Sequence, residues 1–236
     1  MKSRFLAESD ARRKKITYKD IFEANNLFEK SERAYNQDWV SAHRFIDWDN
    51  LYLLSDREVM TRVIKFLNRW KSRIKKDYRA VEAIKNAHKN SIIYIKAIEN
   101  ESLWDLNYDK EFHINNDFYK LLEVIFIIFN RFRDIGYHIR ETAATKLLHH
   151  INSKLFIMWD RKIAEAYKVK RTPYNYVYEF LPIMNEKINQ VIDSYIQDLH
   201  INRNEAINAL NSYRPYKTLI KLLDEYNWIN YTFLAK

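Results

Sequence analysis

A single glycine, Gly136, stands among the 236 residues of this chain, together with three prolines. Average usage would give roughly 16 glycines in a chain of this length. Phosphate-binding P-loops, G-x-G-x-x-G dinucleotide turns and nucleophile elbows all need clustered glycines, because their backbone takes positive φ angles or closely approaches a ligand. The sequence therefore excludes these three kinds of site. The scarcity of turn residues predicts an all-α fold rather than a β-sandwich or barrel.

The rest of the composition predicts a cytoplasmic protein with a substantial core. Hydrophobic residues make up 47% of the chain, which is too apolar for a disordered protein. The absence of cysteine excludes disulfides, zinc fingers, iron–sulfur clusters and thiol nucleophiles. The longest apolar run, Val124–Phe129, is too short to cross a membrane, and the first residues lack a signal-peptide pattern. We expect no membrane association and no cofactor.

The chain carries an excess of positive charge. Lys and Arg number 40 against 31 Asp and Glu, which leaves a formal net charge of +9. Such a charge attracts phosphate groups and acidic proteins alike. It therefore leaves both kinds of partner open.

A capping box and an apolar repeat predict a long helix that carries a row of cations. Ser55 and Glu58 form the box, and apolar residues then recur at three- and four-residue steps as far as Ile74. Cations repeat on the opposite face over roughly 20 Å, with no acidic residue between them. We call them the basic ridge, which either contacts phosphates or is an ordinary solvated face. The ridge comprises Arg62, Lys65, Arg69, Arg73 and Lys76. Thr17, followed by Asp20 as an acidic third residue, predicts the start of an earlier helix that runs through about Ala34.

The most distinctive segment runs from Gly136 to Tyr167. An almost wholly buried helix is expected before Gly136, which suits a left-handed position at the helix end. A short helix from Arg140 to Ile151 and an apolar loop follow. Asp160 then stands in the position of an N-cap for the next helix.

Three pieces of this segment match a known pattern. Thr142-Ala-Ala-Thr-Lys-Leu-Leu148 is similar to K-T-A-N-V-V-L, Leu155-Phe-Ile-Met-Trp-Asp160 to P-T-I-A-V-D, and Arg161-Lys-Ile-Ala-Glu-Ala-Tyr167 to the helix that follows. In this the segment resembles the helix-hairpin-helix DNA glycosylases, the endonuclease III-like superfamily. The resemblance implies a two-lobed helical bundle. Residues 56–155 would form a central lobe with a degenerate hairpin, and residues 1–55 plus 156–236 a second lobe carrying the Asp160 helix.

The resemblance also implies a function, namely binding of double-stranded DNA and excision of a flipped base. Asp160 would be the catalytic carboxylate, which stabilises the oxocarbenium-like sugar or activates water. Members with lyase activity carry a lysine where this chain has Thr142, so we expect a monofunctional N-glycosylase. Lys146, one helical turn further on, is either a displaced amine or a surface lysine. The hairpin glycines are absent, and His138 or Arg140 is expected to contact phosphate instead.

The residues leave alternatives to base excision open. Asp160 is either a helix cap alone, contributing about 1 kcal/mol, or a cap that also catalyses. An open, positively charged cleft around Asp160 would favour catalysis, and a covered side chain would favour capping. The second candidate function is a non-enzymatic all-α protein that binds nucleic acid or an acidic protein through its basic face. A metal-dependent nuclease ranks last, because no motif of clustered carboxylates is present.

Two further groups of residues have the chemistry of a site. His149 and His150 are adjacent in a helix, so their side chains point about 100° apart and cannot bind one metal ion together. We expect them to form a surface pair, and we expect no metal site. An aromatic run near position 176 either stacks on bases or packs in the core. It comprises Tyr174, Tyr176, Tyr178 and Phe180.

Overall fold

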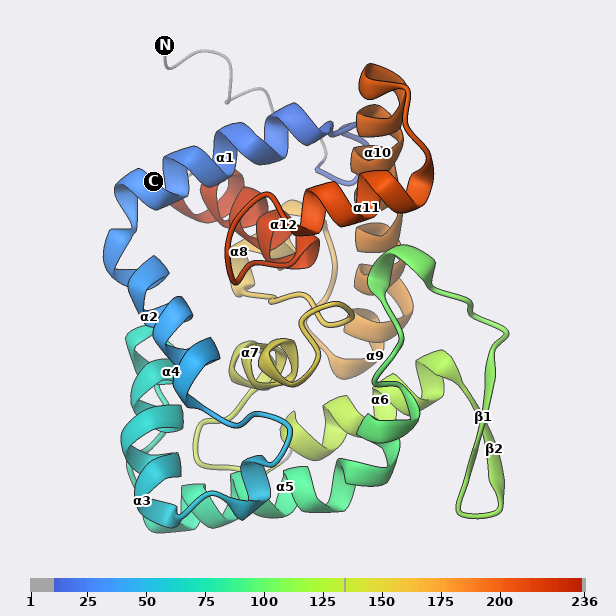
Figure 1. The fold of residues 1–236 in the computed structure, drawn as a ribbon. Coiled ribbons are helices and arrows are strands. Elements are labelled where there is room, and N and C mark those ends of the chain that lie inside the picture. Colours follow the sequence, from blue (N-terminus) through green and yellow to red (C-terminus); the bar gives the residue numbers. More distant parts are fainter. Residues whose placement is uncertain (1–10, 134, 235–236) are drawn as a thin grey trace.

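The computed structural model describes residues 11–133 and 135–234, and this part of the chain is mainly helical (Figure 1). The α-helices are α1 (Tyr18–Ser31), α2 (Arg33–Phe45), α3 (Asp56–Glu58), α4 (Lys65–Arg69), α5 (Tyr78–Ala97), α6 (Leu121–Arg133), α7 (Glu141–Ile151), α8 (Arg161–Ala166), α9 (Pro173–Asn175), α10 (Leu181–Leu199), α11 (Arg203–Asn211) and α12 (Leu219–Trp228). Segments of π-helix continue three of them, at Val59–Ile64, Tyr176–Phe180 and Ile229–Phe233. Single turns of 3-10 helix lie at Leu51–Leu53 and Leu103–Asp105. The predicted helical fold class is confirmed.

A small antiparallel hairpin, which the sequence analysis did not predict, interrupts the helices. It consists of β1 (Glu111–Ile114) and β2 (Asp117–Lys120). The two residues between the strands, Asn115 and Asn116, have φ angles of +52° and +69°, as a type I′ turn requires. Asparagine tolerates this conformation, so the hairpin forms without a glycine.

Two predicted helix starts are confirmed as capping boxes. The Ser55 hydroxyl accepts a hydrogen bond from the amide of Glu58, and the Glu58 carboxylate accepts one from the amide of Ser55. Thr17 and Asp20 make the same reciprocal pair at the start of α1. Each box satisfies amides that would otherwise lack an intrahelical partner.

The helix that starts after Ser55 ends at Arg69, earlier than its apolar repeat indicates. Lys71 takes a φ of +61° just beyond the helix end. The amide of Lys71 donates to the carbonyl of Asn68, and that of Ser72 donates to the carbonyl of Leu67, both at 3.0 Å. This is a Schellman motif with lysine at the position that glycine usually takes. Because the sequence shows no glycine there, the helix end was not predicted.

The basic ridge is therefore not one face of a single helix, and that part of the prediction is wrong. Arg62, Lys65 and Arg69 lie on the helix, whereas Arg73 and Lys76 lie in the loop that follows. Arg73 itself has a φ of +57°. The turn sends the second half of the ridge in a different direction from the first.

Helix α7 lies in the middle of the molecule, with helices on both sides (Figure 1). Helices α5 and α6 pack against each other and α6 packs against α7, while α12 contacts α1, α10 and α11. Helix α2, which belongs to the predicted second lobe, contacts both α1 and α4. The division into lobes of residues 56–155 and of residues 1–55 plus 156–236 stays a prediction, and residues 1–10 lie outside the described part. None of the described helices has the length and apolar character needed to cross a bilayer.

The central position of α7 buries the two histidines that were expected at the surface. His149 is 0% and His150 5% exposed. The rings of Trp39 and Trp48 flank His150, with centroids 4.4 and 4.3 Å from its own. The surface prediction is wrong because α2 and the segment after it cover the face of α7 that the sequence pattern left polar.

The loop between α7 and α8 is part of the core. Residues 155–159 are all nearly buried. The hydroxyl oxygen of Thr145 accepts from the amide of Trp159 at 3.2 Å, and His149 Nδ1 donates to the carbonyl oxygen of Phe156 at 2.5 Å. Side chains of α7 thus fix the point from which α8 starts.

Candidate functional site

A cavity of about 620 Å³ lies between α7, the start of α8, α12 and the turn after α4. Its wall carries eight Lys or Arg side chains and two aspartates, so it attracts anions. Several aromatic rings also line it, and these suit a planar ligand. The cations are Lys71, Arg73, Arg140, Lys146, Arg161, Lys162, Arg171 and Lys221, the carboxylates Asp160 and Asp224, and the rings Phe28, Tyr35, Trp70, Trp159 and Trp228.

The cavity brings together residues that the sequence analysis assigned to separate roles. Asp160 and Lys146, the two candidate catalytic residues, both line it. Three of the candidate phosphate contacts, Arg73, His138 and Arg140, line it as well. These five come from three stretches of chain, which the turn after α4, the turn before α7 and the buried loop before α8 bring together.

The other candidate phosphate contacts lie outside this cavity. Arg62 forms an ion pair with Glu58 at 3.4 Å, and the guanidinium of Arg69 contacts the carboxylate of Asp38. Both of these arginines are therefore partly neutralised, although the sequence shows no acid between the ridge positions. The remaining cations of the ridge, Lys65 and Lys76, are exposed.

Asp160 both caps a helix and lines the cavity. One carboxylate oxygen accepts from the amide of Ile163 at 2.9 Å, which confirms the predicted N-cap. The other accepts from the hydroxyl of Thr232 at 3.1 Å. An ionised carboxylate has about four acceptor positions, so these two bonds leave it able to accept further hydrogen bonds. The side chain is half-buried rather than covered.

Lys146 is a half-buried residue of the cavity wall and not a free surface lysine. Its ammonium group donates to the carbonyl oxygen of Trp70. Burial disfavours the charged amine and lowers its pKa to about 8, and the carboxylates of Asp224 and Asp160 only partly oppose this effect. A substantial fraction of the neutral amine is therefore present near pH 8.

A buried ion pair, Lys221 with Asp224, forms the back of the cavity and was not predicted. The two groups lie 2.8 Å apart, and the Lys221 ammonium also lies 4.6 Å from the ring centroid of Trp70. Burial raises the pKa of the Asp224 carboxyl, although the Lys221 charge opposes the shift. In the sequence the pair shows only a three-residue helical spacing, which is equally typical of a surface pair.

The turn before α7 takes the place of the predicted degenerate hairpin. Gly136 has a φ of +79°, which confirms its left-handed conformation, and Tyr137 and His138 follow with +51° and +65°. The amide of Ile139 donates to the carbonyl of Gly136 at 2.8 Å, which closes a turn of the I′ pattern. The amide of Lys75 donates to the carbonyl of Tyr137 at 3.2 Å and joins this turn to the loop after α4.

The cations at the mouth of the cavity lack anionic partners. Arg73 and Arg140 are exposed, and neither makes an ion pair or side-chain hydrogen bond with the residues that the structure describes. Lys162 is likewise unpaired within residues 11–133 and 135–234. Uncompensated cations around a hollow are suited to bind phosphate groups.

The aromatic run that was considered for base stacking lies elsewhere. Tyr176 and Phe180 are completely buried in the core, and Tyr174 is 61% exposed. Neither they nor Tyr178 line the cavity. The core alternative therefore holds for the two buried rings, and other rings occupy the candidate site.

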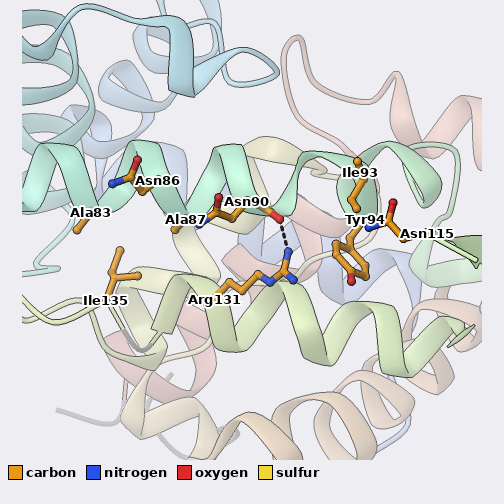
Figure 2. Close-up of a pocket in the computed structure, with 9 residues that line it drawn as sticks. All are labelled: Ala83, Asn86, Ala87, Asn90, Ile93, Tyr94, Asn115, Arg131 and Ile135. Carbon is orange, nitrogen blue, oxygen red and sulfur yellow. Dashed lines mark hydrogen bonds between the residues drawn. The ribbon is translucent and has the colours of Figure 1, made fainter. Parts of the chain in front are cut away.

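A second hollow of about 630 Å³ lies between α5 and α6 (Figure 2). Its single charged residue, Arg131, reaches across from α6 and donates to the carbonyl oxygen of Asn90 on α5. The guanidinium also lies 4.5 Å from the ring centroid of Tyr94. Because its charge is engaged between the helices, this hollow lacks the free cations of the first. Nowhere in the described part do three or more His, Asp or Glu side chains group as they would to hold a metal ion.

Comparison of the chain with protein family models, with curated protein sequences and with solved structures gave no match. The residues of the cavity are therefore the basis for assigning a function.

Proposed function

We propose that this protein binds double-stranded DNA and excises a base as a monofunctional N-glycosylase, with Asp160 as its catalytic carboxylate. One observation carries the proposal: a single basic cavity contains Asp160 and Lys146 and has Arg73, His138 and Arg140 at its wall. A volume of about 620 Å³ is ample for a flipped nucleotide. The aromatic and cationic wall supplies both surfaces that such a nucleotide needs.

The proposed reaction uses the carboxylate at the sugar. The C1′–N bond breaks and its electron pair leaves with the base, while the Asp160 carboxylate stabilises the positive charge on the sugar. A water molecule then forms the new bond to C1′, and its proton passes through Asp160 to the departing base. Thr142 stands where lyases of this kind carry their lysine, and its hydroxyl accepts from Arg171 at 2.9 Å. The reaction therefore ends at an abasic site.

Replacement of Asp160 by asparagine tests the catalytic role. Asparagine caps a helix about as well as aspartate, so Asp160→Asn should keep the fold and lose base release. The measurement is single-turnover release of bases from a panel of damaged duplexes. Asp77→Asn is the matched control, because Asp77 caps α5 by accepting from the amide of Arg79 at 2.9 Å and lies outside the cavity. No base release by the wild type across the panel, together with no salt-dependent DNA binding, would refute the proposal.

The phosphate-binding residues are tested through the salt dependence of DNA binding. Removing one cation that touches a phosphate should reduce the slope of log affinity against log salt by about 1. We expect this reduction for Arg73→Gln and for Arg140→Gln, because both cations are exposed and unpaired at the cavity mouth. Lys65→Gln, on the helix half of the basic ridge, is the comparison variant. An equal reduction for Lys65→Gln alone would assign DNA binding to that helix instead.

The second candidate is a non-enzymatic protein that binds nucleic acid or an acidic partner through the same basic face. The bonds of Asp160 to Ile163 and Thr232 favour it, since a structural role accounts for both. It predicts that Asp160→Asn leaves binding intact and that neither protein releases a base.

A further inference from the structure

Three histidine rings meet where α2 lies against α7. The ring centroid of His150 lies 5.8 Å from that of His43, on α2, and 6.0 Å from that of its neighbour His149. Trp39 of α2 contacts all three rings, at 5.1 Å from His43, 5.1 Å from His149 and 4.4 Å from His150. Trp48, just after α2, stacks on His150 at 4.3 Å. Much of the cover over the two histidines of α7 thus comes from α2 and the segment that follows it.

Most nitrogens of these rings lack hydrogen-bond partners. Nδ1 of His43, Nε2 of His149 and both nitrogens of His150 are buried and unpaired among the residues that the structure describes. A protonated ring in the same place would carry two N–H donors and a charge. It would gain no acceptor for the donors left unpaired here, so protonation in the closed arrangement is costly.

The charge that faces the histidine cluster is also unfavourable for protonation. It is the ammonium of Lys221 on α12, which lies 4.8 Å from the ring centroid of Trp39 and forms its own ion pair with Asp224. From α4 the cluster meets uncharged aromatic rings. Within the described part of the chain, none of the three histidines pairs with a carboxylate. A proton therefore binds favourably only when the cluster opens to water.

The segment that covers the cluster is less firmly held than the core helices. We call residues 33–48 the flap. Only Trp39 and Ala42 are buried along α2, whereas α10 and α12 each bury seven or more residues. The start of α2 at Glu32 has no side-chain cap. The flap is attached by a hydrogen bond from the indole N–H of Trp39 to the carbonyl of Tyr216, at 2.9 Å. Segments with few buried residues open at a lower free energy than the whole fold.

We infer that the flap is acid-sensitive, separating from α7 when His43 and His150 take up protons while the remaining helices stay folded. Burial lowers the pKa of both histidines, so the closed flap binds fewer protons than the open one. The open form is therefore favoured increasingly as the pH falls below about 6.5, the ordinary histidine value. Tyr35, on the same helix, lines the cavity, so opening of the flap also removes part of the cavity wall. This inference does not depend on what the cavity binds.

Amide hydrogen exchange of the wild-type protein tests the flap. Mass spectrometry at pH 7 and pH 5 gives protection factors, which correct for the intrinsic effect of pH on exchange, for peptides of the flap and of α10. Each histidine that gains a proton on opening favours the open form by up to about tenfold per pH unit. We expect flap protection to fall by about tenfold or more, to stay below that of α10 at both pH values, and to depend less on added urea. Flap protection that is independent of pH, or that equals α10 in size and urea dependence, would overturn the inference.

Two variants connect the acid response to the cluster. His43→Gln and His150→Phe each remove one titrating ring, so each should lessen the fall in flap protection between pH 7 and pH 5 several-fold. His43 is only half-buried, so His43→Gln should fold even if His150→Phe does not, and protection of α10 at pH 7 shows which variants are folded. His88→Gln is the matched control, because His88 is buried outside the flap and stacks on Tyr52. A fall in His43→Gln as large as in the wild type, or a response lost equally in His88→Gln, would contradict the assignment.

Discussion

Lys146 illustrates how position in the fold determines the chemistry of one side chain. Lysine at an exposed helix position is a fully charged ammonium at neutral pH. In the cavity wall the same group donates to the carbonyl of Trp70 and loses much of its hydration. The Asp160 and Asp224 carboxylates return part of the stabilisation of the charge, which leaves the amine with a pKa of about 8.

Competitive acylation should reveal this amine. The reactive form of lysine is the neutral amine, so the labelling rate of Lys146 should reach half its maximum near pH 8. A lysine amide in free solution, labelled in the same tube, should continue to gain rate toward about pH 10.4. Peptide mass spectrometry across pH 6 to 11 measures both. A Lys146 profile that follows the free amide would show that burial does not shift its pKa.

For single residues, the sequence predicted the roles that depend on the local sequence pattern. The apolar loop followed by Asp160 indicated a helix cap, and the cap is present. That Lys146 and Arg73 line the same cavity depends on contacts between distant segments, for which helical periodicity carries no signal. The buried pair of Lys221 and Asp224 has a spacing that surface pairs share, so sequence reasoning had no basis for selecting it.

Helix ends in this protein take left-handed conformations on residues other than glycine. Lys168 ends α8 with a φ of +56°, and the amide of Val169 donates to the carbonyl of Ala164 at 2.9 Å. His200 ends α10 with a φ of +54°. A side chain in this conformation costs roughly 1–2 kcal/mol, because Cβ approaches the backbone closely.

The cost can be measured at His200, which is exposed. His200→Gly and His200→Ala remove the same imidazole, but only the glycine variant removes Cβ. We expect the glycine variant to unfold with a free energy about 1 kcal/mol higher than the alanine variant. Urea denaturation of the two proteins gives the difference. Equal stabilities would mean that the left-handed conformation is not strained at this position.

Element boundaries could be predicted where the signal is a side-chain cap but not where it is a backbone conformation. The capping boxes at Thr17 and Ser55 are both confirmed. The helix end at Arg69 was missed because Lys71 gives no indication of a left-handed turn. The hairpin did leave a signal, the Asn115-Asn116 dipeptide between two short alternating segments, and the general lack of glycine obscured it.

Four histidines of this protein are buried or half-buried, and burial lowers the pKa of each. Burial lowers the pKa of His149 to about 3 and that of His88 to about 4. It also lowers the pKa of His150, well below its usual value, and that of His43. The rings of His43, His149 and His150 pack around Trp39, and that of His88 packs against Tyr52, so protonation of any of them is coupled to loss of core packing.

The free energy of unfolding should therefore fall as the pH decreases below about 6.5. The unfolded chain takes up protons on these histidines in that range, whereas the folded chain does not. Each such histidine contributes about 1.4 kcal/mol per pH unit within its window. Denaturant unfolding at pH 7.5, 6 and 5 measures the slope. His43→Gln should make the slope shallower, and a pH-independent stability above pH 5 would contradict the expectation.

The whole-molecule arrangement was only partly predictable. Composition and periodicity indicated a helical fold with a large core, as the structure has. They did not indicate that α7 is enclosed, because its polar residues His149 and His150 resemble a solvated face. Enclosure depends on α2, whose contacts with α4 join segments that the sequence pattern treats separately.

The hydrogen bond from Lys75 to Tyr137 has a consequence for the length of any bound ligand. It joins the turn that carries Arg73 to the turn that carries His138, so the two sides of the cavity mouth form one frame. A frame of this kind fixes the spacing between its positive charges before binding and lowers the entropy lost on association. Under the proposed function, the affinity for DNA would depend on the distance between two phosphates along a strand as well as on the total charge of the protein.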